Sequence, residues 1–347
     1  MNAAKIIDSL YQKHDASREE LLWLIENRGR DISQLLYERA RAVARAHYGN
    51  KIYVRGLIEM TNYCRNDCYY CGIRRGNAAA QRYRLTKDDI MRCCEAGYAL
   101  GFRTFVLQGG EDMYYTDDLT AEIIAAIRAR YPDCAITLSL GEKSRESYQR
   151  LYDAGADRYL LRHETATPAH YARLHPAELS LANRIACLRN LKEIGYQVGC
   201  GSMVGSPYQT PENIVEDLLF IKIFAPQMVG MGPFIPHHDT PFAREKAGTA
   251  ELTLFLLAIV RLMNPKVLLP ATTALGTIED NGRELGVLAG CNVVMPNLSP
   301  LDVRKKYMLY DNKISTGDEA AEARASLERR MSAIGYEIVT ARGDYKD

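Results

Sequence analysis

The chain has 347 residues, of which 47% are hydrophobic, so it can bury a large core as one α/β domain or as two average domains. Its formal net charge of +1 gives no reason to expect a nucleic acid or another polyanion as a partner. No run of about 18 apolar residues predicts a membrane helix, and the N-terminus lacks a signal-peptide pattern. Nine cysteines, an odd number spread over a long chain, argue against a disulfide framework, so we expect a cytoplasmic protein.

Residues 1–50 are expected to form a helical cap over one end of the main fold. Ser17 to Glu20 has the capping-box pattern, and an apolar stripe follows it. This segment has no group of ligand-like side chains, so we predict a packing role. Residues 313–347 are expected to form a C-terminal tail and helix.

From residue 51 onward, short apolar runs alternate with helical patterns, which indicates a parallel sheet. We count eight such runs: Ile52–Glu59, Thr104–Gln108, Ala135–Leu140, Arg158–Leu161, Gln197–Met203, Met228–Phe234, Val267–Ala271 and Asn292–Met295. Eight strands with intervening helices predict a complete (β/α)8 TIM barrel over residues 51–312, within a single domain that spans residues 1–347. Polar residues or glycines follow nearly every run, and they should converge at the mouth of the barrel, where active sites lie.

Cys64, Cys68 and Cys71 fall within eight residues, in the segment TNYCRNDCYYCGIR that follows the first predicted strand. Thiolates are soft ligands that suit zinc or an iron-sulfur cluster. A structural zinc site usually takes four ligands in two paired half-sites, and no second pair follows here. A [4Fe-4S] cluster held by three cysteines leaves one iron open for chemistry, so we favour one such cluster.

The C-x3-C-x2-C spacing, with Tyr70 just before the third cysteine, resembles the signature of the radical S-adenosylmethionine (SAM) enzymes. The resemblance implies that the open iron binds SAM and that Tyr70 lies near the adenine. Gly109, Gly110 and Glu111 resemble the GGE motif of these enzymes, whose backbone and carboxylate meet the SAM amino group. Glycines permit such a close approach because they have no Cβ, although a glycine pair by itself indicates only a turn.

Further SAM contacts are predicted after the later strands. Glu164 follows the fourth run and Arg184 lies on the next helical pattern. A carboxylate suits a ribose or amino group, and a guanidinium binds a carboxylate with two hydrogen bonds. A salt bridge at the barrel rim explains these two residues equally well. Met203, with Val204 and Gly205, resembles the adenine-binding turn of the same enzymes, and an ordinary strand end is the alternative.

Arg162 and the pair Thr272 and Thr273 are candidates for binding a substrate rather than SAM. An arginine that points into a barrel needs an anion, and adjacent hydroxyls can complete a carboxylate site. Met295 and Tyr307 are expected to line the apolar side of this site. For each residue taken singly, a contact at the barrel rim is an equally good interpretation.

His237, His238 and Asp239 have metal-ligating side chains, and they raise the weaker hypothesis of a zinc-dependent barrel hydrolase. Adjacent residues on an extended chain point in opposite directions, so we favour an ordinary loop. The other six cysteines are isolated or lie in a helical pattern, and we predict that they are buried apolar residues.

The chain also resembles the HydE family of [FeFe]-hydrogenase maturases over roughly residues 50–312, in the segments CRNDCYYCGIRR, RYLLRHETATP, GSMVG, MVGMGPFIPHHDTP, PATTALGT and NVVMPN. The resemblance implies that Cys64, Cys68 and Cys71 hold the cluster and that SAM is cleaved to methionine and a 5′-deoxyadenosyl radical. The radical would attack the sulfur of a cysteine-bound iron carbonyl-cyanide complex during assembly of the hydrogenase two-iron subcluster. It also implies an external electron donor and other hydrogenase maturases as partners.

Alternatives remain open within and outside this family. Some HydE members bind a second cluster near the C-terminus, but Ser315 stands where one of its cysteines is expected and no cysteine follows Cys291, so we predict one cluster. A methylornithine synthase-like mutase acting on lysine shares the barrel and the single cluster. Biotin synthase needs additional cysteines that do not fit this pattern. A non-enzymatic iron-sulfur scaffold would need the three clustered cysteines but not Glu111, Glu164 or Arg184.

Overall fold

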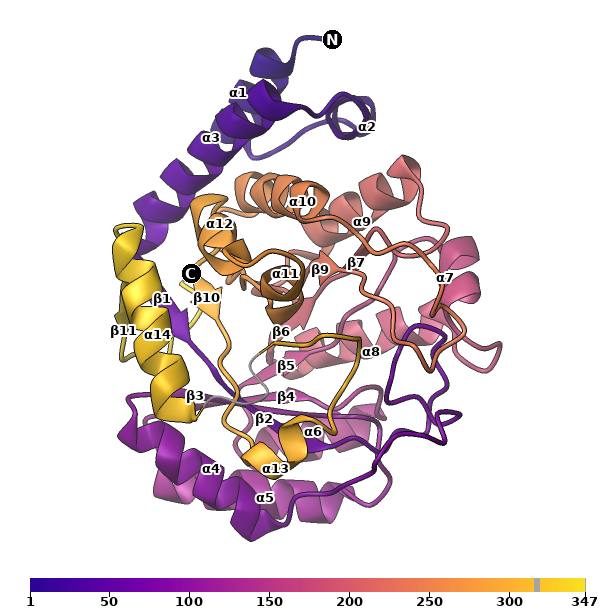
Figure 1. Cartoon of the computed structure of the whole chain (residues 1–347), viewed down its shortest axis with the longest axis vertical. Coiled ribbons are helices and arrows are strands. Elements are labelled where there is room, and N and C mark those ends of the chain that lie inside the picture. Colours follow the sequence, from indigo (N-terminus) through magenta and orange to yellow (C-terminus); the bar gives the residue numbers. More distant parts are fainter. Residues whose placement is uncertain (315–318, 347) are drawn as a thin grey trace.

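The apolar runs pair as parallel strands in the computed structural model, which describes residues 1–314 and 319–346 (Figure 1). Six strands form one sheet in the order β2 (Gly56–Thr61), β3 (Thr104–Gly109), β4 (Ala135–Ser139), β5 (Arg158–Leu160), β6 (Gln197–Cys200) and β8 (Met228–Val229). A second sheet places β1 (Lys51–Val54) between β10 (Val293–Val294) and β11 (Glu337–Val339). Two short strands, β7 (Met203–Val204) and β9 (Gly232–Pro233), pair with each other beyond β6 and β8.

The eight predicted strands are therefore only partly regular. The first run is split at Arg55 into β1 and β2, and the fifth and sixth runs each break into two short strands. At the break in the fifth run, a Cβ on Gly201 would lie 2.0 Å from the carbonyl oxygen of Gly230, so only glycine fits where these two backbones approach each other.

The seventh run, Val267–Ala271, forms no strand in the described chain. It contributes single parallel bridges, from Leu268 to Met228 and from Pro270 to Val293. Pro270 has no N–H to donate, which removes one ladder hydrogen bond. The regular sheet thus has six strands rather than the eight that the sequence predicts. The strand β11 was not predicted, because the tail was expected to be helical.

Helices surround the sheet on its outer side (Figure 1). They are α1 (Ala3–Lys13), α2 (Arg18–Glu26), α3 (Arg30–Tyr48), α4 (Lys87–Ala99), α5 (Asp117–Arg130), α6 (Arg145–Asp153), α7 (Pro168–Leu174), α8 (Leu181–Ile194), α9 (Pro211–Phe224), α10 (Ala250–Met263), α11 (Thr273–Ile278), α12 (Gly282–Leu288), α13 (Leu301–Arg304) and α14 (Ala320–Ala333). The capping box expected at Ser17 is present, and Thr86 and Thr210 form further capping boxes, so local sequence determines where α2, α4 and α9 begin. Every residue of β2 is buried, as expected for a parallel sheet covered on both faces.

The N-terminal helices pack along the flank of the helical layer. Helices α1 and α3 contact α10, and α2 contacts α9. The C-terminal end of α3 reaches the sheets, where the rings of Tyr48 and Tyr53 lie 6.0 Å apart. One hydrophobic cluster includes Ile6 of α1, Ile58 of β2 and Tyr336 near β11, so both ends of the described chain share a core with the sheet. No helix in the described residues is long and apolar enough to cross a membrane.

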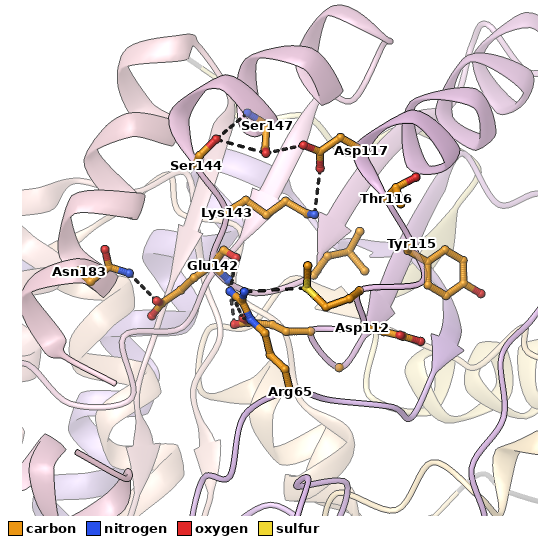
Figure 2. Close-up of a pocket in the computed structure, with 14 residues that line it drawn as sticks. Arg65, Asp112, Tyr115, Thr116, Asp117, Glu142, Lys143, Ser144, Ser147 and Asn183 are labelled. Atoms are coloured by element: carbon orange, nitrogen blue, oxygen red, sulfur yellow. Dashed lines mark hydrogen bonds and ion pairs between the residues drawn. The ribbon is translucent and has the colours of Figure 1, made fainter. Parts of the chain in front are cut away.

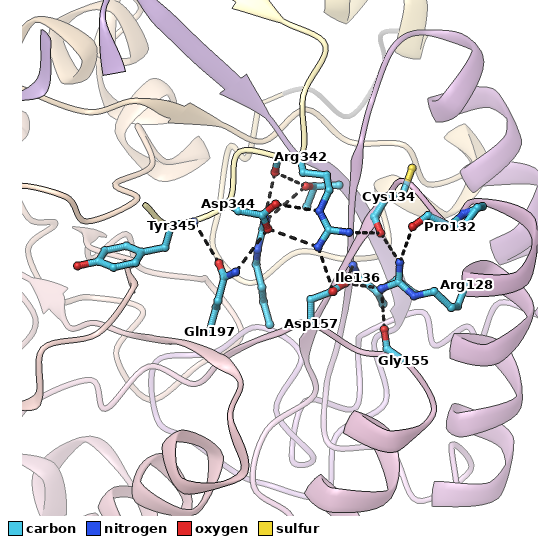
Figure 3. A network of polar contacts seen from close by, with 12 residues as sticks. Arg128, Pro132, Cys134, Ile136, Gly155, Asp157, Gln197, Arg342, Asp344 and Tyr345 are labelled. Carbon is cyan, nitrogen blue, oxygen red and sulfur yellow. Dashed lines mark hydrogen bonds and ion pairs between the residues drawn. The ribbon is translucent and has the colours of Figure 1, made fainter. Parts of the chain in front are cut away.

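Charged side chains fix the C-terminal residues against the N-terminal ends of the strands (Figure 3). The fully buried Arg158 of β5 donates to Asp344 at 2.6 Å. Arg342 donates to Asp157 at 3.0 Å, and Arg128 donates to the same carboxylate at 2.5 Å. The tail thereby covers the end of the sheet opposite to the loops that follow the strands.

A segment after α13, residues 305–314, crosses those loops (Figure 1). We call it the strap. The backbone N–H of Gly72 donates to the Leu309 carbonyl at 2.9 Å, and the N–H of Asp311 donates to the Pro236 carbonyl at 3.1 Å. The strap therefore joins the cysteine-containing loop to the loop that follows β9. Ser315, on which the prediction of a single cluster partly depends, lies outside the described residues.

Candidate active site

The three clustered cysteines lie on a long loop, residues 62–86, between β2 and α4. All three are free thiols and partly exposed. Burial raises the pKa of each thiol, to about 12 for Cys71, and the neighbouring cysteines raise the pKa of Cys68 further. Thiols this close and this weakly acidic become thiolates only when a metal centre binds them.

The spacing of the three sulfurs does not suit a single metal ion. Ligands of one zinc ion, with Zn–S bonds of about 2.3 Å, lie about 4 Å from one another. Among the described residues, the one group of histidine, cysteine and acidic side chains whose ligand atoms all lie within 4.8 Å of one another contains no cysteine. The wider arrangement of Cys64, Cys68 and Cys71 suits a centre with several metal ions.

Arg82 holds the cysteine loop in shape. Its guanidinium donates to the carbonyl oxygens of Ile73 at 2.8 Å, Arg74 at 2.7 Å and Asn77 at 3.0 Å, and also to that of Asn62. One partly buried cation thus satisfies four carbonyl groups of an irregular loop, which would otherwise lose hydrogen bonds. Sequence reasoning missed Arg82, because nothing in the local pattern shows where a side chain's partners lie.

The glycine pair after β3 lies directly against this loop. A Cβ on Gly110 would be 2.1 Å from the carbonyl oxygen of Tyr63 and 2.7 Å from the Cβ of Cys64. A Cβ on Gly109 would be 2.9 Å from a methyl carbon of Thr61. The Glu111 N–H points at the Cys64 sulfur, 3.4 Å away. Only glycine at position 110 allows the two loops to approach this closely.

The Glu111 carboxylate is buried and already engaged. Arg65 donates to one oxygen at 2.9 Å, and the Glu142 N–H donates to the other at 2.9 Å. Gly141, with φ of +76°, leaves the space that this carboxylate occupies. Glu111 therefore links the loops that follow β2, β3 and β4.

Arg184, in the first turn of α8, is buried and forms an ion pair with Glu142 at 2.7 Å. Burial lowers the pKa of Arg184, but the Glu142 carboxylate together with Tyr171, Tyr70 and Glu111 outweighs it and holds the pKa above the ordinary value. Asn183 donates to the second oxygen of Glu142 at 2.5 Å. Sequence reasoning did not single out Glu142, which lies in the fragment SLGE after the third predicted strand.

Arg162 and Glu164, which were predicted to bind different molecules, form an ion pair at 2.8 Å. Glu164 has φ of +64°, a left-handed conformation that is uncommon outside glycine. Its N–H donates to the Gly201 carbonyl at 3.0 Å, and its carbonyl accepts from Met203 at 3.2 Å. Neighbouring strands thus hold the strained residue in place.

Tyr70 and Met203 lie on the apolar side of the site. Met203 is buried in a cluster with Leu174 and Phe234, and Tyr70 packs against this cluster. The Tyr70 hydroxyl lies 3.2 Å from Nε2 of His175. Burial lowers the pKa of His175 to about 3, so its ring is neutral at physiological pH.

The predicted substrate residues are spread around the same end of the fold. Thr272 is the N-cap of α11 and accepts a hydrogen bond from the Leu275 N–H, and Thr273 is the first residue of that helix. Met295 packs against a separate buried cluster that includes Tyr53 and Met228. Thr272 therefore has a structural role, and its hydroxyl hydrogen is still able to donate to a ligand.

Tyr307 of the strap is buried beside a charged pair that the sequence did not reveal. Its hydroxyl accepts from the Gln108 amide at 3.3 Å. Glu59, at the end of β2, pairs with Lys313 and accepts from the Asn297 amide at 2.8 Å. Glu59 meets Asn297 and Lys313, which lie 238 and 254 residues further along the chain, only after folding, so no local pattern could indicate this pair.

A cavity of about 550 Å³ opens beside the cysteine loop (Figure 2). Arg65, Glu111 and Glu142 line one side of it, and Lys143, which pairs with Asp117 at 3.1 Å, lines another. Gly110 and Glu111 are the predicted site residues that line this cavity, whereas the predicted substrate residues do not. The cavity therefore adjoins the predicted SAM contacts Gly110 and Glu111 and is distinct from the predicted substrate site.

Comparisons with known proteins agree with this arrangement. The family model for the Radical SAM superfamily matches residues 58–221. The chain is 44% identical over 314 residues to the [FeFe] hydrogenase maturase subunit HydE of Thermotoga maritima, covering 90% of this chain and 89% of that protein. It is 27% identical to 3-methylornithine synthase of Methanosarcina acetivorans, covering 95% of this chain and 92% of that protein. The crystal structure of methylornithine synthase superposes with a TM-score of 0.83 at 25% identity, covering 96% and 97% of the two chains.

The fold alone does not separate these relatives, since methylornithine synthase shares it. The sequence does, because the identity to HydE is 44% and that to 3-methylornithine synthase is 27%. The relationship is to an enzyme, so the hypotheses of a non-enzymatic scaffold and of a zinc-dependent hydrolase are wrong. The chain belongs to the HydE family of [FeFe]-hydrogenase maturases within the radical SAM superfamily, whose members use a [4Fe-4S] cluster and SAM.

Proposed function

We propose that Cys64, Cys68 and Cys71 hold a single [4Fe-4S] cluster at which SAM binds. Support comes from three free, partly exposed thiols spaced too widely for one metal ion, on a loop fixed by Arg82. Gly110 leaves room beside Cys64 that a methyl group would fill. When both are bound, the cluster and SAM supply a carbon-centred radical by one-electron cleavage of SAM.

The SAM contacts that we propose lie around these cysteines. Gly109, Gly110 and Glu111 face the amino group of SAM, and Arg184 binds its carboxylate. Glu164 binds the ribose, while Tyr70 and Met203 contact the adenine. Two observations support these assignments. Arg184 is a buried cation suited to a carboxylate, and Met203 and Tyr70 share one apolar cluster suited to adenine.

We propose that the substrate is a cysteine-bound iron carbonyl-cyanide precursor of the hydrogenase two-iron subcluster. Arg162, Thr272 and Thr273 would bind its carboxylate, and Met295 and Tyr307 would line the apolar side. The 44% identity to HydE over nearly the whole chain carries this proposal. A charged guanidinium and a hydroxyl able to donate are suited to an anion.

The alternative substrate, lysine, is less well accommodated. Its ammonium group would need an acidic partner deep in the site, because an unpaired buried charge is costly. Glu59 is a buried carboxylate at the end of β2, but Lys313 and Asn297 already occupy both of its oxygens. A lysine ammonium group would therefore have to compete with an ion pair that is already formed at this carboxylate.

The ion pair between Arg162 and Glu164 connects the two parts of the site. The two side chains form an ion pair at 2.8 Å and neutralise each other. When the ribose takes the Glu164 carboxylate, Arg162 loses its partner and becomes available to the substrate anion. SAM is therefore expected to bind before the substrate and to strengthen substrate binding.

The proposal also includes the closed barrel, the domain organisation, the location and the partners of the protein. The bridges at Leu268 and Pro270 support a closed (β/α)8 barrel over residues 51–312, in one domain with the helices of residues 1–50 and the tail of residues 313–347. We propose a cytoplasmic protein that works with an external electron donor and with other hydrogenase maturases.

Product analysis tests the substrate. The reconstituted protein would be incubated anaerobically with SAM, a reductant and either L-lysine or the cysteine-bound iron complex. We expect 5′-deoxyadenosine formation to accelerate only with the iron complex. Efficient conversion of lysine to 3-methylornithine would contradict the proposed substrate while leaving the SAM site intact.

A further inference from the structure

Exposed apolar side chains gather beside the cysteine loop. Among the described residues, six large apolar side chains are exposed, and three of them, Tyr63, Met113 and Tyr114, belong to the two loops that meet at Cys64. Tyr63 directly precedes Cys64, and Met113 and Tyr114 follow Glu111, whose N–H points at the Cys64 sulfur. Single exposed apolar residues are common on protein surfaces, but a group of them marks an interaction site.

Two arginines join these side chains into one surface. The guanidinium carbon of Arg84 lies 3.9 Å from the centre of the Tyr63 ring and 4.8 Å from that of Tyr114. Nη1 of Arg65 lies 3.9 Å from the Met113 sulfur (Figure 2). Both arginines also form ion pairs with carboxylates of the loop after β3, so the surface is ordered before a partner arrives. Tyrosine, methionine and arginine are the residue types that are enriched at protein interfaces.

The cysteine loop gives this surface a positive charge. Residues 62–86 contain five arginines and one acidic residue, Asp67, so they carry a formal charge of +4 in a chain whose net charge is +1. Glu111 and Asp112 of the neighbouring loop lower the charge of the whole surface to +2 but do not reverse it. Such a surface attracts acidic partners and disfavours basic ones, and the attraction weakens as salt is added.

Arg75 extends the positive charge along the loop. Its backbone N–H donates to the Asn66 carbonyl at 2.8 Å, which places Arg75 beside the residue that follows Arg65. Its side chain is 62% exposed and forms an ion pair at 3.7 Å with the equally exposed Glu178, which contributes little. The charge of Arg75 therefore remains available to a partner.

We propose that this surface docks a small acidic electron-carrier protein of the ferredoxin kind, which is the external electron donor for SAM cleavage. We call the surface the docking patch, and it consists of Tyr63, Arg65, Arg75, Arg84, Met113 and Tyr114. This inference rests on the proposed cluster at the three clustered cysteines. Each SAM that is cleaved to methionine and a 5′-deoxyadenosyl radical takes up one electron, and the reduced donor loses that electron.

The position of the docking patch favours an electron donor over other protein partners. Adjacent Cα atoms are about 3.8 Å apart, so a donor that contacts Tyr63 is one peptide link away from the proposed cluster ligand Cys64. Electron transfer slows steeply with distance, so a donor gains from this closeness in a way that other partners do not. Complexes of electron-transfer proteins are small, with less than about 1,200 Å² buried in total, and a few exposed side chains are enough to form one.

Ferredoxin-driven SAM cleavage tests the docking patch. Reconstituted protein would receive electrons either from dithionite, which needs no docking surface, or from a reduced acidic [2Fe-2S] ferredoxin, and 5′-deoxyadenosine would be measured. Met113 is 70% exposed, and we expect Met113→Glu to raise the half-saturating ferredoxin concentration about tenfold or more while dithionite-driven cleavage stays unchanged.

Ile223→Glu is the matched control for Met113→Glu. Ile223 is 82% exposed in the last turn of α9, and because α9 leads into β8, this turn lies at the end of the sheet opposite to the cysteine loop. We expect the control to depend on ferredoxin as the wild type does. Equal ferredoxin dependence in the two variants would overturn the proposal.

Charge reversal tests the electrostatic part of the proposal. Arg75→Glu should weaken ferredoxin binding about three- to tenfold at low salt and should reduce its dependence on NaCl. Arg329→Glu, at an exposed position on α14, makes the same change in net charge and is the control. Ferredoxin binding that is equally strong and equally salt-dependent in both variants would contradict the proposal.

The two reductants separate failure of the docking patch from failure of the proposed cluster site. Absence of SAM cleavage with dithionite would count against the cluster site, and calorimetric titration with ferredoxin would then still decide whether Met113→Glu binds more weakly than Ile223→Glu. A wild-type chain that cleaves SAM with dithionite but does not bind the ferredoxin saturably would overturn the docking patch alone. So would self-association of the wild type in analytical ultracentrifugation that Met113→Glu abolishes, because a second copy of the chain would then occupy the patch.

Discussion

Replacing Gly110 by alanine is the most direct test of how the cysteine loop and the loop after β3 cooperate. The new methyl carbon would lie 2.1 Å from the Tyr63 carbonyl oxygen and 2.7 Å from the Cβ of Cys64. Both contacts involve backbone or the start of a side chain, so neither can rotate away. The two loops would have to separate by about 1 Å to restore van der Waals contact.

The expected cost follows from this displacement. Overpacking of a tight contact typically costs about 1–3 kcal/mol of stability. A misplacement of about 1 Å in a catalytic arrangement can reduce the rate about 100-fold. Because the Glu111 N–H points at Cys64, we expect Gly110→Ala to keep its fold but to cleave SAM at least tenfold more slowly and to bind SAM more weakly.

The assay is anaerobic 5′-deoxyadenosine production by reconstituted protein, with iron content measured on the same samples. Gly29→Ala is the matched control, because no atom lies within 4 Å of the Cβ that it adds. We expect the control to behave like the wild type. If Gly110→Ala matched the control in cleavage rate, SAM affinity and iron content, the close approach of the two loops would have no catalytic importance.

Three further changes test other parts of the site. Cys68→Ala should abolish 5′-deoxyadenosine production, since two thiolates do not hold the cluster; full production would refute the cluster assignment. Arg184→Ala should weaken SAM binding about tenfold to a hundredfold, because a charged hydrogen bond worth about 1.5–3 kcal/mol is lost. Arg162→Ala should affect mainly substrate turnover. If calorimetry gave both variants the same SAM affinity, the assignment of Arg184 to SAM and Arg162 to the substrate would be wrong. Lys313→Met should destabilise the protein by about 3–5 kcal/mol in denaturant unfolding, and adding Glu59→Gln should restore part of the loss, because the damage comes from an unpaired buried carboxylate.

Much of the fold could be predicted from sequence because its signals are local. The capping box at Ser17 and the apolar run of β3 depend on neighbouring residues, and both were predicted correctly. The break between β6 and β7 lies instead where Gly201 approaches Gly230, a residue between β8 and β9 that is distant in sequence. β11 was missed for the same reason, since it pairs with β1 at the other end of the chain.

The candidate site likewise contains some residues that the sequence indicates and others that it does not. The spacing of Cys64, Cys68 and Cys71 is visible in the sequence because three ligands of one centre lie on one loop. Arg82 and Glu142 could not be predicted, because their importance comes from partners that only folding brings near. The local cysteine spacing therefore allowed a metal centre to be predicted from the sequence. The residues that hold the surrounding loops, such as Arg82 and Glu142, could be identified only from the folded structure.

Charged residues of the predicted SAM site already form ion pairs with other residues of the protein. Glu111 pairs with Arg65, and Arg184 pairs with Glu142. A buried charge without a partner is costly, so a site that must exist before its ligand arrives needs internal partners. On the proposed assignment, SAM, which carries both an amino group and a carboxylate, would exchange with these partners instead of meeting bare charges. Its net affinity would be the difference between two sets of ion pairs, and removing Arg184 would weaken binding while also leaving Glu142 without its ion-pair partner.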